Sequence, residues 1–180
     1  MKRGGVASLI WTANSPHTEQ YSQLLNASYY PISFLKSKSP FLTPIRYVLQ
    51  SLQTLWVLIK QRPHTVHVVN TPVFAAMCVY LYCLLTGSSY IMDVHGHSMS
   101  GKWAWAKPIQ KILSRRALVN IVDQAKNISI MEEWGAPYII LERPPVGVAT
   151  DRLTRTASEK EFMITVVSIF ASDEPIDLVV

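Results

Sequence analysis

Short apolar runs alternate with helix-spaced apolar positions along most of the chain. The apolar, β-favouring runs predict strands at residues 6–11, 27–32, 66–69, 89–93, 117–122 and 138–141. The segments between them predict helices at residues 18–25, 44–61, 73–85, 103–116 and 124–134. Strands that are apolar throughout and alternate with helices are typical of parallel βαβ units. We therefore predict an α/β fold with a Rossmann-like parallel sheet and helices on both faces.

Several details of the helices follow from the same pattern. The helix at 44–61 carries its apolar residues at the three-and-four spacing of one face, namely Ile45, Val48, Leu49, Leu52, Leu55, Trp56 and Ile59. The stretch 73–85 is the most lipophilic but is too short for a membrane span, so we expect a buried helix. Ser15 with Pro16 can begin the first helix, and Gly135 can end the last.

The pattern changes near residue 146. Residues 147–160 are mostly polar and lack apolar periodicity, which is typical of a linker. Residues 161–170 look like a fresh buried strand, and residues 172–175 like the start of a helix. We therefore expect one domain at 1–146, a linker at 147–160 and the beginning of an incomplete second domain at 161–180.

Composition narrows the class of protein. About half of the 180 residues are apolar, which excludes intrinsic disorder. The net charge of +5 suits an anionic partner such as a nucleotide, a phosphate or a lipid headgroup, but is equally common without one. The sequence has no arginine-rich tract of the kind that binds nucleic acid. Cys78 and Cys83 lack the spacing of a metal or redox motif and suit a reducing, cytoplasmic location.

The end of the strand at 89–93 is the strongest candidate for chemistry. The apolar run gives way to Asp93, His95, Gly96, His97 and Ser98. Ligands bind at the carboxyl ends of strands in open α/β sheets. One histidine, foremost His95, can contact a substrate hydroxyl or phosphate, because histidine titrates near neutral pH. Two alternatives remain: a loop histidine that bonds only local backbone, and a metal site made by Asp93, His95 and His97.

The turn after the first strand is a second candidate. Asn14, Ser15 and His17 precede or begin a helix, and a helix N-terminus favours anions. A plain capped turn explains the same residues. The glycine fingerprint of dinucleotide binding, the Walker loop and the Gly-x-Ser-x-Gly turn are all absent from the sequence. Their absence lowers the odds of a nicotinamide dehydrogenase, a P-loop enzyme and an α/β-hydrolase.

A basic and aromatic cluster at 102–107 is a third candidate. Lys102, Trp103, Trp105 and Lys107 lie there, and three further cations follow by residue 116. Tryptophan beside lysine suits a membrane interface with anionic lipid. The alternative is an ordinary amphipathic helix with its tryptophans in the core.

Taken together, four passages resemble the N-terminal half of a retaining GT-B-fold glycosyltransferase of the group often called family four. They are residues 60–72, ending in Asn-x-Pro; residues 89–95, ending in Asp-x-His; residues 134–145, with two terminal prolines; and residues 170–176, around Asp-Glu-Pro. There is also some likeness to mannosyltransferases that extend lipid-linked oligosaccharides. The shared order of these passages spans nearly the whole chain.

The resemblance implies a role for each candidate residue. It makes His95 the catalytic residue that reaches the donor sugar in a cleft between two domains. It makes the remaining candidates substrate-binding: Asn14, Ser15, His17, Asp93, Gly96, His97 and Ser98. The turn at 14–17 lacks the glycine-rich look usual in the family.

The resemblance also implies the ligands and the partners. A nucleotide sugar is the co-substrate, with no cofactor and no metal, and the acceptor is a glycan or a lipid-linked molecule. The donor-binding domain is missing from this sequence except for its start, so we expect the chain to be inactive alone. It could pair with a partner chain that carries the donor domain, act as a non-catalytic binding module, or contact a membrane peripherally.

Overall fold

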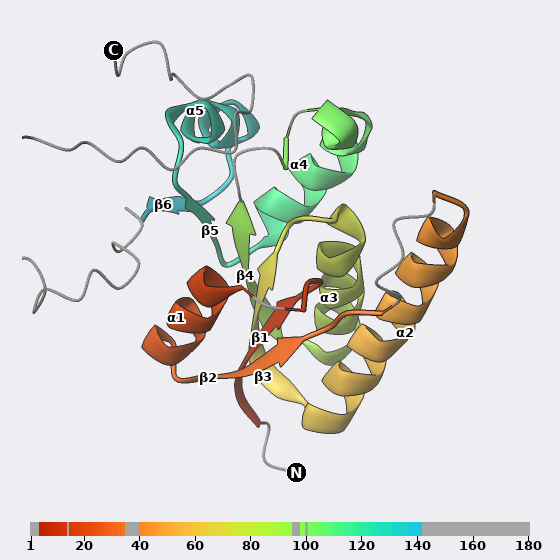
Figure 1. The fold of residues 1–180 in the computed structure, drawn as a ribbon. Helices are drawn as coiled ribbons and strands as arrows, with labels where there is room; N and C mark the ends of the chain where they lie inside the picture. Colours follow the sequence, from red (N-terminus) through yellow and green to blue (C-terminus); the bar gives the residue numbers. More distant parts are fainter. Residues whose placement is uncertain (1–3, 14, 35–39, 95–97, 100, 142–180) are drawn as a thin grey trace, which may run out of the picture. The chain divides into compact units, whose positions relative to one another are not determined.

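The computed structural model describes residues 4–13, 15–34, 40–94, 98–99 and 101–141. These residues fall in the first of the two units into which the chain divides, Met1–Val146 and Gly147–Val180. The strands are β1 (Gly4–Ile10), β2 (Ala27–Pro31), β3 (Pro63–Val69), β4 (Ser89–Val94), β5 (Val119–Val122) and β6 (Tyr138–Ile140). They form one sheet of order β2-β1-β3-β4-β5-β6 (Figure 1). Every neighbouring pair is parallel.

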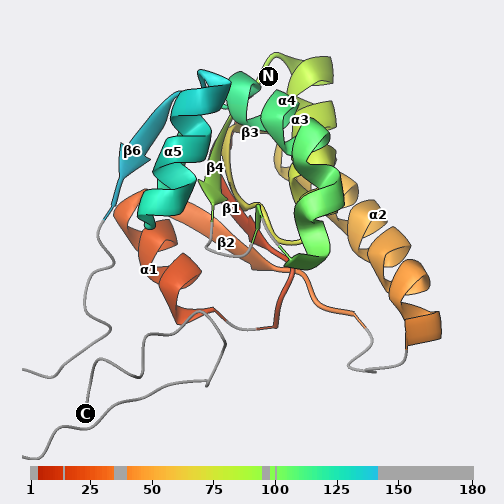
Figure 2. The same ribbon diagram turned by 90° about the horizontal axis from the view of Figure 1, so that it is seen from above.

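Helices connect each strand to the next. They are α1 (Pro16–Leu24), α2 (Thr43–Gln61), α3 (Val73–Thr86), α4 (Lys107–Arg116) and α5 (Ala125–Trp134), with the 3-10 helices η1 (Pro40–Leu42) and η2 (Gly101–Ala106). The chain runs from β1 outward to β2, and then back past β1 to β3. Because such crossovers are right-handed, this reversal requires α1 and α2 to lie on opposite faces. Figure 2 shows α1 across the sheet from α2 and α3. The predicted α/β fold is thereby confirmed.

The local signals read from the sequence hold at both ends of helices. Ser15 caps α1, where its Oγ accepts a hydrogen bond from the Thr18 N–H at 3.3 Å. Gly135 ends α5 with a φ of 60°, a left-handed conformation that glycine adopts without strain. The predicted helix at 103–116 was wrong at its start, because residues 101–106 form a 3-10 turn. Pro108, which lacks an N–H, lies in the first turn of α4.

The helix α2 buries polar side chains and exposes most of its apolar face, which is the reverse of the usual amphipathic arrangement. The residues that it buries are Gln50, Thr54, Val57 and Leu58. Thr54 Oγ1 accepts from Trp11 Nε1 at 2.9 Å, and Gln50 Nε2 donates to the Ile32 carbonyl at 3.1 Å. The predicted apolar face is therefore turned outward, and Leu52 is 60% exposed.

The helix α3 was expected to be buried, and that is right for one face only. Val73, Ala76 and Val79 are fully buried against the sheet. Met77, Leu81, Leu84 and Leu85 are exposed. None of the helices in the described ranges is both long enough and apolar enough to cross a bilayer.

The orientation of α2 predicts opposite results at two neighbouring positions. Thr54→Val leaves the buried Trp11 Nε1 without its acceptor, and should lower the free energy of unfolding by about 1–3 kcal/mol. Leu52→Gln changes an exposed side chain and should alter it by less than about 0.5 kcal/mol. Urea unfolding followed by circular dichroism measures both values. A larger cost for Leu52→Gln than for Thr54→Val would contradict the observed orientation.

Candidate functional site

The strand order reverses between β1 and β3, which are neighbours in the sheet. The helix after β1 leads toward β2, whereas the helix after β3 leads toward β4. The two connections diverge, so the carboxyl ends of β1 and β3 flank the position where ligands bind in open α/β sheets. The segments at this edge are the turn that follows β1, the residues 70–72 after β3, and the end of β4.

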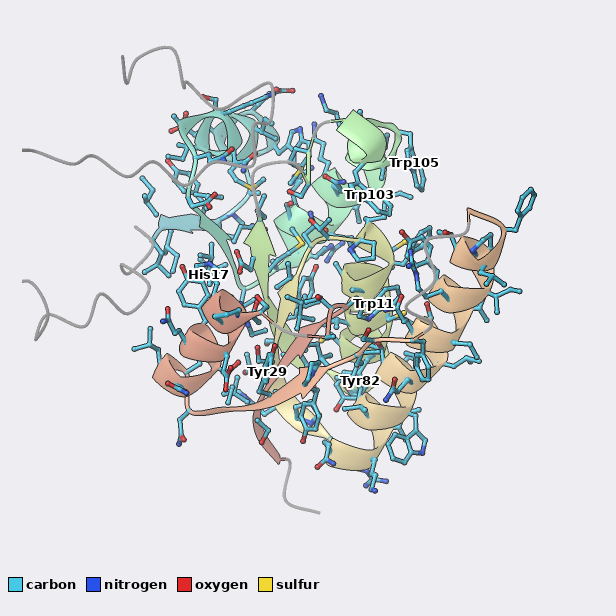
Figure 3. The ribbon with its side chains drawn as sticks, in the orientation of Figure 1. Trp11, His17, Tyr29, Tyr82, Trp103 and Trp105 are labelled. Atoms are coloured by element: carbon cyan, nitrogen blue, oxygen red, sulfur yellow. The ribbon has the colours of Figure 1, made fainter. Side chains whose placement is uncertain are left out.

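Ser15 and His17 lie at the N-terminus of α1, beside this edge. The Ser15 Oγ bonds both the N–H and the Oγ1 of Thr18, the latter at 2.9 Å. The His17 ring (Figure 3) is half-buried. Its centroid lies 4.4 Å from the centroid of the Tyr21 ring. The first turn of a helix presents backbone N–H groups that favour an anion. This arrangement positions a titratable ring next to an anion-favouring helix end.

A polar series crosses the three central strands just below the edge. Ser8 of β1 pairs in register with His67 of β3, and their side chains are joined by a Ser8 Oγ–His67 Nδ1 hydrogen bond of 2.8 Å. Asp93 of β4 pairs with Val69, two residues beyond His67, so it projects from the same face of the sheet. His67 Nε2 lies 3.9 Å from Asp93 Oδ2.

The side chains of this series are buried, so an unpaired charge among them would lower stability. His67 is 0% and Asp93 3% exposed. A carboxylate in the interior is costly unless a charged or hydrogen-bonded partner compensates it. The His67 ring lies within ion-pair distance and can provide such compensation when it is protonated. The ring of Tyr21 packs edge-on against His67, with centroids 6.0 Å apart. Aromatic contacts therefore link His17 on the edge to the buried series.

Asn70 at the end of β3 is a further candidate. Its N–H donates to the Asp93 carbonyl at 2.9 Å, which extends the pairing of β3 and β4 to the edge. Its side chain is buried, and neither amide atom has a hydrogen-bond partner among the described residues. A buried amide without a partner has lost its hydrogen bonds to water and gained none in the protein, which costs free energy. Asn70 is therefore suited to bind a polar ligand at this edge.

The predicted site residues divide into two groups. Ser15, His17 and Asp93 lie at the carboxyl edge, as expected for the ends of parallel strands. Ser98 is buried, and its carbonyl accepts from Gln110 Nε2 at 2.7 Å, so this residue is tied to α4. Asn14, His95, Gly96 and His97 lie outside the described residues, and their roles stay predictions.

The proposed metal site stays a prediction for the same reason. Within the described ranges, no group of three or more metal-binding side chains comes together. Two of the three suggested ligands, His95 and His97, lie outside those ranges.

Sequence reasoning did not single out Ser8, His67 or Asn70 as site residues. A signal was present, since each is a polar residue within or directly after a run of apolar strand residues. In a sheet that is covered on both faces, such a residue is buried and needs a polar partner.

Comparison with solved structures gives a similarity of fold. No protein-family model and no curated protein matches the chain. A similar solved structure is the crystal structure of Glycyrrhiza uralensis UGT73P12 complexed with glycyrrhetinic acid 3-O-monoglucuronide. The TM-score is 0.48 and the identity 9%, over 78% of this chain and 42% of that chain. The chain thus spans less than half of that structure.

The buried series predicts coupling between His67 and Asp93. His67→Leu leaves the Asp93 carboxylate without this partner, and should lower the free energy of unfolding by about 3–5 kcal/mol. Adding Asp93→Asn should recover part of that loss, with a coupling energy of about 0.5–3 kcal/mol. The measurement is a double-mutant cycle from denaturant unfolding.

A matched control lies on the same strand. His64 is exposed at the other end of β3, and His64→Leu should have a small effect that adds to that of Asp93→Asn. Equal costs for His67→Leu and His64→Leu, or purely additive effects of His67→Leu and Asp93→Asn, would contradict the role given to the series.

Proposed function

We propose that the chain forms the acceptor side of a retaining GT-B-type transferase, which moves a sugar from a nucleotide sugar to a glycan or a lipid-linked acceptor. The observation that carries this proposal is the reversal of strand order at β1 and β3, with Ser15, Asn70 and Asp93 at the same carboxyl edge. The sequence resemblance assigns substrate contacts to this edge.

The side chains at the edge suit a hydroxyl-rich ligand. The amide of Asn70 both donates and accepts hydrogen bonds, as a sugar hydroxyl requires of its partner. His17 can donate, accept or transfer a proton. We assign to His95 the contact with the donor sugar, and to Gly96, His97 and Ser98 the acceptor side of the cleft. These assignments rest on the Asp-x-His resemblance that begins at Asp93.

The transfer needs more than this edge. A departing nucleotide diphosphate requires positive charge or hydrogen-bond donors as negative charge develops on it. The resemblance places most of these groups, and an acidic pair, in a second domain that would begin near residue 161. We therefore expect this chain to turn over no substrate until such a domain is supplied, either in the same chain or by a partner. The unpaired thiols of Cys78 and Cys83 fit a reducing, cytoplasmic setting.

Restoring a donor domain tests the proposal. The chain alone should release no nucleotide from a panel of nucleotide sugars, whereas the chain joined at residue 146 to the donor domain of a retaining GT-B enzyme should release it in the presence of acceptor. In the active form, His95→Ala should lower kcat by about a hundredfold or more. Asn70→Ala should mainly raise KM for the acceptor, because it removes a binding contact.

The exposed His64, at the far end of β3, is the matched control, and His64→Ala should leave turnover unchanged. Full turnover by residues 1–180 alone would refute the need for a second domain. A joined protein that binds glycans but never turns over would favour a non-catalytic binding module instead.

A further inference from the structure

The outer surfaces of α2, α3 and α4 form a continuous apolar face, here named the α2–α4 face. Contacts join α2 to α3 and α3 to α4 (Figures 1 and 2). Its exposed apolar side chains are Ile45, Val48, Leu52, Trp56 and Ile59 of α2, Met77, Leu81 and Leu84 of α3, Trp105 of η2, and Ile112 of α4. Soluble monomers rarely expose apolar patches of this kind without a binding role.

Three neighbouring hollows lie along this face. One lies between α2 and η2, and a second lies between α3 and α4; Ser51 and Phe74 line both. Ile112 lines the second hollow and also a third, where the remaining lining residues include Lys111, Arg115 and Arg116. The apolar hollow and the basic hollow therefore adjoin at Ile112.

The charge on the α2–α4 face has one sign. No aspartate or glutamate occurs at residues 20–92 or 94–122, so α2, α3, η2 and α4 contain no acidic residue. Their cations, other than Lys102, are Arg46 and Lys60 on α2 and Lys107, Lys111, Arg115 and Arg116 on α4. The acidic side chains of the described ranges belong to other elements, such as Glu19 of α1 and Glu132 of α5. The face is therefore complementary to a surface that carries only negative charge.

The aromatic residues suit a boundary between water and hydrocarbon. Trp56 is 59% exposed, and Lys60 Nζ lies 4.7 Å from the centroid of its ring. Trp105 is exposed to the same extent. Tryptophan prefers the interfacial region of a bilayer, and lysine can extend its ammonium group to the headgroups above an apolar stem. The alternative that both tryptophans of the 102–107 cluster lie in the core is wrong for Trp105, which is exposed, whereas Trp103 is half-buried.

We propose that the α2–α4 face docks on an anionic lipid bilayer, with its apolar side chains at the acyl boundary and its cations at the headgroups. A second copy of the chain is a poorer occupant, since a two-fold pair through this face would bring cationic surfaces together with no acidic partner. A bilayer supplies both an apolar layer and a uniform negative charge. The proposal is independent of the transfer reaction.

Vesicle flotation tests the proposal. The chain should float with vesicles of phosphatidylcholine and phosphatidylglycerol, and remain in solution with phosphatidylcholine alone or at high salt. The apolar variant Leu52→Gln with Trp56→Gln, and the charge variant Lys111→Gln with Arg115→Gln, should each lower the partition coefficient by roughly tenfold or more. All four positions lie on the surface hollows or are exposed, so the fold should persist, as circular dichroism would show.

Matched controls lie on other helices. Leu24→Gln on α1, where the side chain is 74% exposed, and Lys126→Gln on α5 should partition as the unchanged chain does. Absence of flotation with anionic vesicles, or equal losses in the control variants, would refute the proposal.

Two other results would assign the face to a different occupant and also refute docking on lipid. One is a dimer in sedimentation that the apolar variant dissociates. The other is strong protection of exposed α2 surface from covalent labelling in the lipid-free chain, which would mean that residues 142–180 cover the face. None of these measurements uses a nucleotide sugar, so their failure is distinct from failure of the proposed transfer.

Discussion

The pairing of β1 with β3 is the constraint on which the rest of the structure depends. Because the chain reaches β2 first and then returns past β1, α1 is required on one face and α2 on the other. The same reversal makes the connections diverge at the carboxyl edge and leaves a position for a ligand there. It also gathers α2, α3 and α4 side by side, which creates the α2–α4 face. The candidate site and the candidate docking surface thus have one topological cause.

The adjacent strands β1, β3 and β4 also carry a buried polar series. Ser8, His67 and Asp93 occupy one face of three adjacent strands, where apolar side chains would pack at no polar cost. Ser8 and His67 are hydrogen-bonded, and the His67 ring lies within ion-pair distance of Asp93, so the three side chains are energetically linked.

The sequence predicts local elements well and their partners poorly. Apolar periodicity located the strands and most helices, because it depends on local geometry. It identified the apolar face of α2 but not whether that face is buried or exposed. The orientation of α2 depends on hydrogen bonds from its other side, between Thr54 and Trp11 and between Gln50 and Ile32. These partners are far apart in sequence and meet only in the folded chain. Likewise, the residues next to His67 in sequence do not predict that Ser8 and Asp93 lie beside it, because the strand register decides this. Long-range pairing, not local pattern, decides both cases.

The site edge and the α2–α4 face are connected through aromatic rings. Trp11, directly after β1, lies 6.1 Å from Tyr47 of α2, which lies 5.3 Å from Phe74 of α3. Phe74 in turn lies 6.1 Å from Trp103, so the series leads from the end of β1 to the hollow at η2. Figure 3 labels its two ends, Trp11 and Trp103. All distances join ring centroids.

This connection is a packed contact of the interior. Trp11 belongs to the hydrophobic core, and Tyr47, Phe74 and Trp103 pack against that core. Burial of aromatic area and ring-to-ring geometry both stabilise such a series. The rings therefore fix α2 and η2 relative to the end of β1, so the position of the α2–α4 face and the position of the site edge depend on the same core.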